Sequence, residues 1–243
     1  MPFATAIAFP SASVLMLAYG WRFPFYISLT IGITATVVFT ALVKEGPFAE
    51  HKMKASTRRA IGNFEIWKVG LVWLFFNAAA LSFTTWAPTL FEKFQNMPQV
   101  QASFSASLLM WTAILFVPFY GYMSDRTGKR KPFAILGSFL MTLAFIALAF
   151  TSNLALIASI LALGITAAMV PPIVSTLPVE ILGPNLASVG FGITGTCSNI
   201  GIAFAQPLVG LLLDITNSYT LCLLGIAALS AVGAIVAYTS KTN

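Results

Sequence analysis

The sequence predicts an all-α integral membrane protein with about eight transmembrane helices. Apolar residue types make up 58% of its 243 residues, whereas Asp, Glu, Lys and Arg together make up only 8%. A soluble domain carries roughly 25% charged residues, because its surface must stay in contact with water. The few charges are separated by long uncharged runs, and about 20 apolar residues suffice for one helix to cross the hydrocarbon core.

This composition excludes several classes of protein. A soluble enzyme or a disordered chain needs many more charged residues. The net charge of +6 comes from basic residues that cluster between apolar runs, a pattern typical of oriented membrane proteins rather than nucleic-acid binders. Cys197 and Cys222 both lie in apolar runs, so the sequence offers no disulfide framework and no paired metal ligands. We therefore expect no nucleic-acid partner, no metal and no cofactor.

The uncharged runs predict where the chain crosses the membrane. Residues 132–179 would form a helix roughly 70 Å long, more than twice the hydrocarbon thickness, so this run must fold back. Thr151, Ser152 and Asn153 form the only polar cluster near its middle. The first segment is short and contains Pro10. The predicted segments are 3–18, 23–43, 67–90, 104–123, 132–150, 154–177, 186–212 and 219–240.

The basic residues predict the orientation of these segments. With loop 44–66 in the cytoplasm, 11 Lys and Arg residues fall on the cytoplasmic side and two, Arg22 and Lys93, on the other. This bias follows the positive-inside rule. We expect a multi-pass protein of the plasma membrane whose loop 44–66 and C-terminus are cytoplasmic, and His51 is expected to be a solvated loop residue. The 11 residues are Lys44, Lys52, Lys54, Arg58, Arg59, Lys68, Arg126, Lys129, Arg130, Lys131 and Lys241.

One specific motif lies between the fourth and fifth segments. Residues 121–131 read GYMSDRTGKRK, which resembles the cytoplasmic loop motif of the major facilitator superfamily, G-x-x-x-D-R-x-G-R-R/K-x. Lys129 stands where that family more often has arginine, so charge is kept and bidentate geometry is lost. The resemblance implies a gating role for the motif residues and for a carboxylate on the same side of the membrane. These residues are Gly121, Asp125, Arg126, Gly128, Lys129, Arg130 and Glu180.

The position of the motif implies a domain organisation. In this family the motif follows the second helix of each six-helix half. By this resemblance, residues 67–243 form a six-helix C-terminal half, 44–66 a cytoplasmic linker, and 1–43 the last two helices of an incomplete N-terminal half. The turn at Gly20, Trp21 and Arg22 is similar to one before the sixth helix of the family. Helices one to four have no counterpart, so a fragment, a truncated gene product and an eight-helix relative all remain open.

The charges of the motif suggest a latch. Asp125 lies at the end of a predicted helix, where the negative end of the helix dipole disfavours an anion. It therefore needs a partner, which Arg126, Arg130 or the N-terminal end of a neighbouring helix could supply. Glu180 can pair with the same arginines, so the cluster could close the cytoplasmic side in one state and break in another. The alternative is that the four cations only hold the loop inside the cell.

Candidate substrate contacts must come from uncharged residues. In this family the site lies near the membrane midplane between the two halves, yet the middle of segments three to eight contains no Asp, Glu, Lys or Arg. A buried amide needs a partner, which is either substrate or an interhelical hydrogen bond. The Pro171–Pro172 pair predicts a kink or a break. The predicted substrate-binding residues are Asn77, Trp73, Trp111, Thr166, Thr196 and Asn199.

Together these features predict secondary active transport of a small solute by alternating access. The Trp86-Ala-Pro88 stretch is similar to permeases for organic anions and cyanate, which suggests an organic anion as substrate. No carboxylate pair, His cluster or Ser-His-Asp set is expected within reach of a shared face, so we expect no enzyme activity. Membrane lipid is an expected partner, as are the missing N-terminal helices or a chain that supplies them. The alternative is a non-transporting membrane chain that assembles with a separate N-terminal piece.

Overall fold

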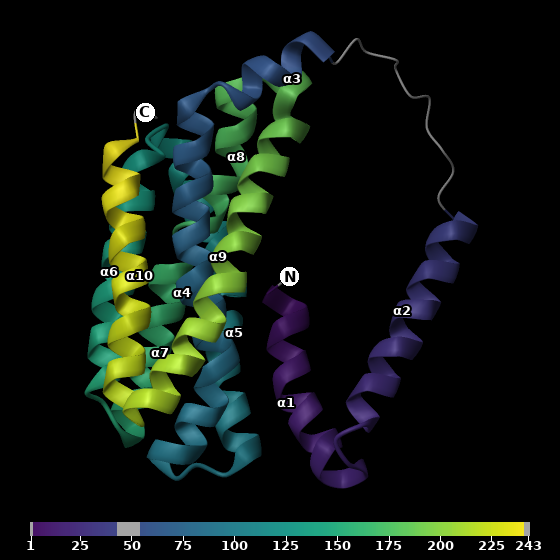
Figure 1. Ribbon diagram of the computed structural model, residues 1–243, viewed down its shortest axis with the longest axis vertical. Helices are drawn as coiled ribbons and strands as arrows, with labels where there is room; N and C mark the ends of the chain where they lie inside the picture. The colour runs from purple at the N-terminus through teal and green to yellow at the C-terminus, as the bar shows by residue number, and fades with distance from the viewer. Residues whose placement is uncertain (1, 43–53, 241–243) are drawn as a thin grey trace.

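The computed structural model describes residues 2–42 and 54–240, and within these ranges every regular element is a helix (Figure 1). The predicted all-α membrane fold is therefore confirmed. The helices are α1 (Pro2–Tyr19), α2 (Phe23–Leu42), α3 (Lys54–Ile61), α4 (Phe64–Gln95), α5 (Gln99–Thr127), α6 (Lys131–Ala149), α7 (Asn153–Ala167), α8 (Pro171–Leu182), the 3₁₀-helix η1 (Pro184–Leu186), α9 (Ala187–Thr216) and α10 (Tyr219–Thr239).

Seven spans in the described ranges are long and apolar enough to cross a membrane, with α7 and α8 counted as one span. The first predicted segment is helical too, but α1 is shorter than the others. The predicted reversal at residues 151–153 is confirmed, because α6 ends at Ala149 and α7 begins at Asn153. Ser152 has extended backbone angles there, which stops the first helix before the second begins.

The sixth predicted segment is interrupted where its two prolines occur. Helix α7 ends at Ala167, and α8 begins at Pro171 and continues to Leu182. Proline has no backbone N–H to donate and suits the first turn of a helix. Pro171 and Pro172 therefore end one helix and begin the next within a single crossing.

The predicted loop 44–66 is wrong in part, because residues 54–61 form helix α3 and α4 already begins at Phe64. Asn63 caps α4, since its side-chain oxygen accepts a hydrogen bond from the backbone N–H of Glu65 at 3.0 Å. Ala60 is fully buried, so packing stabilises this short basic helix. The predictions for His51, and for Lys44, Lys52 and Lys241, lie outside the described residues.

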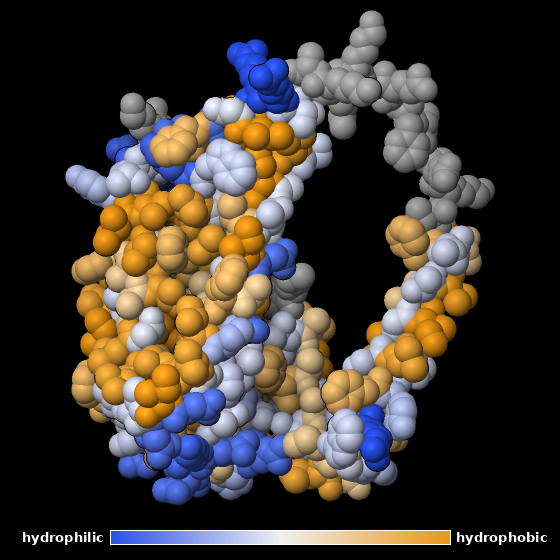
Figure 2. Space-filling view, in the orientation of Figure 1, coloured by the Kyte–Doolittle hydropathy of each residue, from blue (hydrophilic) through white to orange (hydrophobic). Residues whose placement is uncertain are grey.

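Helices α4 to α10 form one bundle in which α4 contacts α5, α8, α9 and α10. The centre of the bundle is aromatic. The ring of Phe83 meets those of Phe145 and Phe91 edge-on, at centroid distances of 5.6 and 6.2 Å. Figure 2 shows apolar residues along the length of the bundle and hydrophilic residues gathered at its two ends, as a membrane-spanning bundle requires.

Glycines bring α4 and α9 very close together. A β-carbon at Gly201 would lie 2.6 Å from the backbone oxygen of Leu74, and one at Gly210 would lie 2.6 Å from the Trp86 ring. Gly192 and Gly195, on another face of α9, have open space beside them. Only some of the small residues of α9 therefore serve close packing.

The N-terminal helices differ in how they meet the bundle. Helix α1 packs against α5, and the buried hydroxyls of Ser13 and Ser103 lie 2.6 Å apart in a hydrogen bond. No residue of α2 is buried. Figure 1 shows α2 standing away from the other helices. The first pair of helices is thus held through α1.

This contact predicts the outcome of a cross-linking experiment. We expect the double variant Ser13→Cys/Ser103→Cys to form a disulfide under mild oxidation, because the two side chains touch. Loss of maleimide labelling at the two new thiols measures the reaction. Ser11 is exposed and its hydroxyl donates to the oxygen of Ile7, so Ser11→Cys/Ser103→Cys is the control and should remain labelled. Equal cross-linking of both pairs would contradict this placement of α1.

Candidate functional site: an ion-paired cluster at one end of the bundle

The guanidinium of Arg130 joins two helices at one end of the bundle. Its Nη2 lies 2.6 Å from Glu180 Oε1 on α8 and 3.3 Å from Asp125 Oδ1 on α5. Nη1 donates a hydrogen bond to the hydroxyl of Thr176, one turn before Glu180 on α8. The Arg130 side chain is 17% exposed, whereas those of Asp125 and Glu180 are 65% and 46% exposed. One partly buried cation thus holds two water-exposed carboxylates.

The local backbone explains why the motif needs Gly128. Gly128 follows the last residue of α5 with φ of 65°, and its N–H donates to Ser124 O at 3.0 Å. Residues other than glycine seldom adopt the left-handed backbone conformation of such a cap. Gly121 faces α8, where a β-carbon would lie 3.5 Å from Pro172 Cβ. Gly128 ends α5 so that Arg130 can turn toward α8, whereas a β-carbon at position 121 would make only an ordinary van der Waals contact with α8.

The remaining motif cations have a different environment. Arg126 and Lys129 are exposed, and neither forms an ion pair within the described part of the chain. Of the two arginines predicted as latch partners, the structure brings only Arg130 to both carboxylates. Arg126 and Lys129 fit the other prediction, in which loop charges orient the chain.

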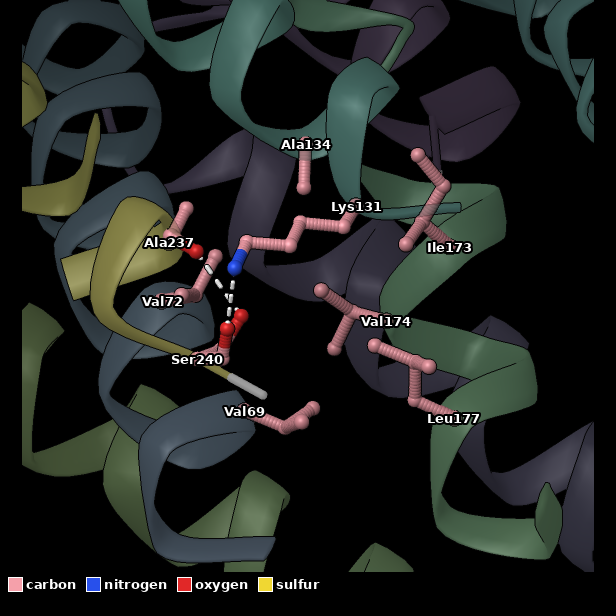
Figure 3. A pocket seen from close by; sticks show the side chains of 9 residues that line it. All are labelled: Val69, Val72, Lys131, Ala134, Ile173, Val174, Leu177, Ala237 and Ser240. Atoms are coloured by element: carbon pink, nitrogen blue, oxygen red, sulfur yellow. Dashed lines mark hydrogen bonds between the residues drawn. The ribbon is translucent and has the colours of Figure 1, made fainter. Parts of the chain in front are cut away.

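Two lysines hold the end of α10 beside this cluster. Lys131 donates a hydrogen bond to Ser240 O, and Lys68 donates to Thr239 O at 3.2 Å. Cations are favourable at a helix C-terminus, where backbone carbonyls lack partners. Figure 3 shows the Lys131 side chain crossing a small pocket toward Ser240. The apolar wall of this pocket consists of Val69, Val72, Ala134, Ile173, Val174, Leu177 and Ala237.

Many of the basic residues of the chain lie at this end of the bundle. The start of α4, the α5–α6 turn, the end of α8 and the end of α10 are connected there through Lys68, Arg130 and Lys131. Helix α3 lies at the same end (Figure 1). Lys93 lies in the last turn of α4, at its other end. The charge asymmetry of the sequence is therefore also an asymmetry in space.

The predicted substrate residues on α4 interact mainly with their own helix. Asn77 is half-buried, and its Nδ2 donates to Trp73 O at 2.8 Å. The Trp73 ring stacks on that of Phe76, with centroids 5.1 Å apart and an interplanar angle of 5°. Asn77 Nδ2 therefore makes a hydrogen bond within its own helix and not the interhelical hydrogen bond considered above.

The other predicted substrate residues are dispersed over three helices. Thr196 and Asn199 are exposed on α9, and Asn199 Nδ2 donates to Gly195 O within that helix at 2.9 Å. Thr166 on α7 donates to Leu163 O. Trp111 on α5 meets the ring of Phe3 of α1 edge-on at 6.2 Å. The six residues thus lie on four helices, α4, α5, α7 and α9.

A cavity of about 480 Å³ lies instead between the N-terminal helices and the bundle, at the end opposite α3. It contains none of the six predicted substrate residues. Its lining combines aromatic rings with hydroxyl, amide and carboxylate groups, the last from Glu92. The lining residues are Ala8, Phe9, Ala12, Ser13, Met16, Trp21, Pro24, Phe25, Pro88, Thr89, Glu92, Gln99 and Ser103.

Sequence reasoning missed several polar contacts between helices. Thr176 could have been found, because it lies four residues before Glu180 and so shares its face of α8. No comparable pattern in the sequence indicated the polar contact between α4 and α9. There, Trp86 Nε1 donates to Gln206 O at 2.9 Å, and Gln206 Nε2 donates to Thr85 Oγ1 at 3.0 Å.

The fold and its apolar spans define a polytopic helical membrane protein. The chain belongs to the Major Facilitator Superfamily, whose family model matches residues 94–242. This confirms the resemblance that the loop motif indicated.

Named relatives and a solved structure agree with this family. The chain is 28% identical over 137 residues to a Staphylococcus haemolyticus protein named "Putative proline/betaine transporter", covering 53% of this chain and 29% of that protein. It is 24% identical to the inner membrane transport protein RhmT of Escherichia coli, covering 80% of this chain and 46% of RhmT. It is also 24% identical to a "Putative tartrate transporter" of Agrobacterium vitis, covering 97% of this chain and 59% of that protein.

A similar fold occurs in the crystal structure of the superfamily transporter FucP in the outward conformation. The TM-score is 0.65 at 14% sequence identity, over 94% of this chain and 58% of FucP. The chain thus spans between 29% and 59% of the length of these proteins.

Proposed function

We propose that this chain is part of a secondary transporter that moves a small solute by alternating access. Residues 67–243 would form one rocking half, and 1–43 would belong to the other half. The rest of that other half would come from a longer form of the chain or from a partner chain. The observation that carries this proposal is the Arg130 cluster, which joins the α5–α6 turn to α8.

The energetics of the cluster suit a gate. Ion pairs whose carboxylates are open to water contribute at most about 1 kcal/mol each, so they break without a large barrier. The contacts between α4 and α9, by contrast, leave no room even for a β-carbon at Gly201. Packed interfaces of this kind move as units rather than deform. The packed interior of the half would therefore rock as one body. The Arg130 contacts at its end would form and break through a local shift of α8 against the α5–α6 turn.

The proposal also includes an orientation and a class of substrate. The end that carries α3 and Arg130 would face the cytoplasm, because most basic residues of the chain belong to it. The middle of the bundle has no charged residue, so any recognition of a charged solute would come from the other helices. An organic anion is the proposed class, in line with the name of the Agrobacterium vitis relative.

An uptake experiment tests this function. The gene would be expressed with any coding sequence that precedes Met1, and residues 1–243 alone would be reconstituted in vesicles. The probes are radiolabelled tartrate, proline and glycine betaine. We expect saturable tartrate uptake from the first preparation and none from the second. Saturable uptake by residues 1–243 alone would contradict the need for further helices. Correct insertion without uptake of any probe would favour a non-transporting partner chain.

A further inference from the structure

A second cavity, of about 280 Å³, lies where α3 meets the ends of the bundle helices. One side of it is polar and is formed by Arg59 and Asn63. The other side is aliphatic and comes from the end of α8 and from η1. The full lining is Arg59, Ala60, Asn63, Ile181, Leu182 and Leu186. Such a cavity suits a ligand that is anionic at one end and apolar at the other.

The charge around this cavity is strongly positive. Helix α3 reads KASTRRAI and contains three cations and no acidic residue. Arg58 and Arg59 are exposed, and in residues 2–42 and 54–240 neither has an ion-pair partner. The nearby carboxylate of Glu65 is paired with Lys68 at 2.8 Å, so its charge is balanced locally. Figure 2 shows strongly hydrophilic residues where α3 lies.

The cavity lies at the ends of bundle helices, the level at which we expect lipid headgroups. Helix α4 begins at Phe64, α8 ends at Leu182 and α9 begins at Ala187, so three bundle helices have an end beside it. Trp67 is 38% exposed there, and its indole N–H donates to Ile61 O at 2.8 Å. Tryptophan side chains are enriched at the boundary between hydrocarbon and water.

We propose that this cavity binds the headgroup of an anionic phospholipid. Arg59, with Arg58 beside it, would donate to the phosphate oxygens, because guanidinium groups match phosphate geometry. The glycerol and the first acyl carbons would lie against Ile181, Leu182 and Leu186. A soluble phosphate would leave this aliphatic wall uncovered, which favours a lipid. The inference rests on the chain being embedded in a bilayer and not on transport.

The test uses the full chain in nanodiscs that contain phosphatidylcholine with increasing amounts of phosphatidylglycerol. Native mass spectrometry of the released protein measures how many lipids of each class stay bound. We expect enrichment of phosphatidylglycerol on the unaltered chain, and about fivefold weaker retention for Arg59→Gln, the effect of about one interfacial cation. Arg59→Lys keeps the charge and should retain more lipid than Arg59→Gln. High salt should reduce the enrichment, because it screens exposed charges.

Two controls separate this site from general attraction. Lys129→Gln removes an exposed cation outside the cavity, and inorganic phosphate is added as a soluble competitor. We expect retention to be unchanged in both. Equal phosphatidylglycerol retention by the unaltered chain, Arg59→Gln and Lys129→Gln would overturn the proposal, as would displacement by millimolar phosphate. The unaltered chain alone also tests the proposal. If it retained phosphatidylglycerol no better than phosphatidylcholine, the proposal would be refuted. Uptake plays no part in this experiment, so its failure would leave the proposed function untouched.

Discussion

Gly201→Ala is expected to destabilise the bundle, although alanine is among the smallest substitutions available. A β-carbon at this position would lie 2.6 Å from Leu74 O and 2.9 Å from Leu74 Cγ. The backbone oxygen cannot move away without shifting α4. Overpacking of this kind costs about 1–3 kcal/mol, and we expect the melting temperature to fall by roughly 2–10 °C. A thiol-reactive dye can follow unfolding in detergent, because Cys197 and Cys222 are both free and buried.

The matched control lies on the same helix. Gly192→Ala places its β-carbon in open space, and alanine is a better helix former than glycine by up to about 1 kcal/mol in water. This variant should melt at the original temperature or slightly above it. If both variants melted alike, close packing between α4 and α9 would not be what makes Gly201 necessary.

Arg130→Gln is expected to open the turn between α5 and α6. The substitution removes the cation between Asp125 and Glu180, which leaves two carboxylates without their common partner. Ser124 reports on this change, because it is buried and its hydroxyl makes no hydrogen bond within the described residues. Cysteine at position 124 should therefore be tolerated. We expect maleimide to label Ser124→Cys about three- to tenfold faster in the Arg130→Gln background, as expected when exposed ion pairs are lost.

Neighbouring cations provide the controls for this experiment. Arg126→Gln and Lys129→Gln each remove one positive charge from the same motif, and both side chains are exposed. Labelling at position 124 should change little in either. If all three variants accelerated labelling equally, the effect would come from net charge, and the specific bridge from Arg130 to α8 would have no role in closing the turn.

Much of the fold could be predicted from the sequence, because the bilayer imposes simple rules. Uncharged length sets the number of crossings. The polar residues at 151–153 marked the reversal between α6 and α7, and the Pro171–Pro172 pair marked the break before α8. Helix α3 was missed, since residues 54–61 are polar and carry no hydropathy signal. Its stability comes instead from burial of Ala60 and from its contact with other helices.

The candidate site was predictable in type but less so in detail. The spacing of the loop motif placed Asp125 and Arg130 at one turn, and the structure brings Glu180 to the same guanidinium. The sequence did not distinguish Arg130 from Arg126, because only three-dimensional packing decides which arginine faces α8. Asn77 and Asn199 looked in need of partners, yet each donates to a carbonyl four residues earlier in its own helix. Periodicity alone does not reveal this local alternative.

The central position of α4 has a consequence for biogenesis. Its tightest contacts are with α9, and it also packs against α10. A ribosome delivers both of these helices only after α5 to α8. Until they arrive, the glycine-lined and aromatic faces of α4 must meet lipid or temporary neighbours in the membrane. The bundle can therefore reach its final packing only after α9 and α10 have been made, and a ribosome that stops before α9 would leave α4 without its principal neighbour.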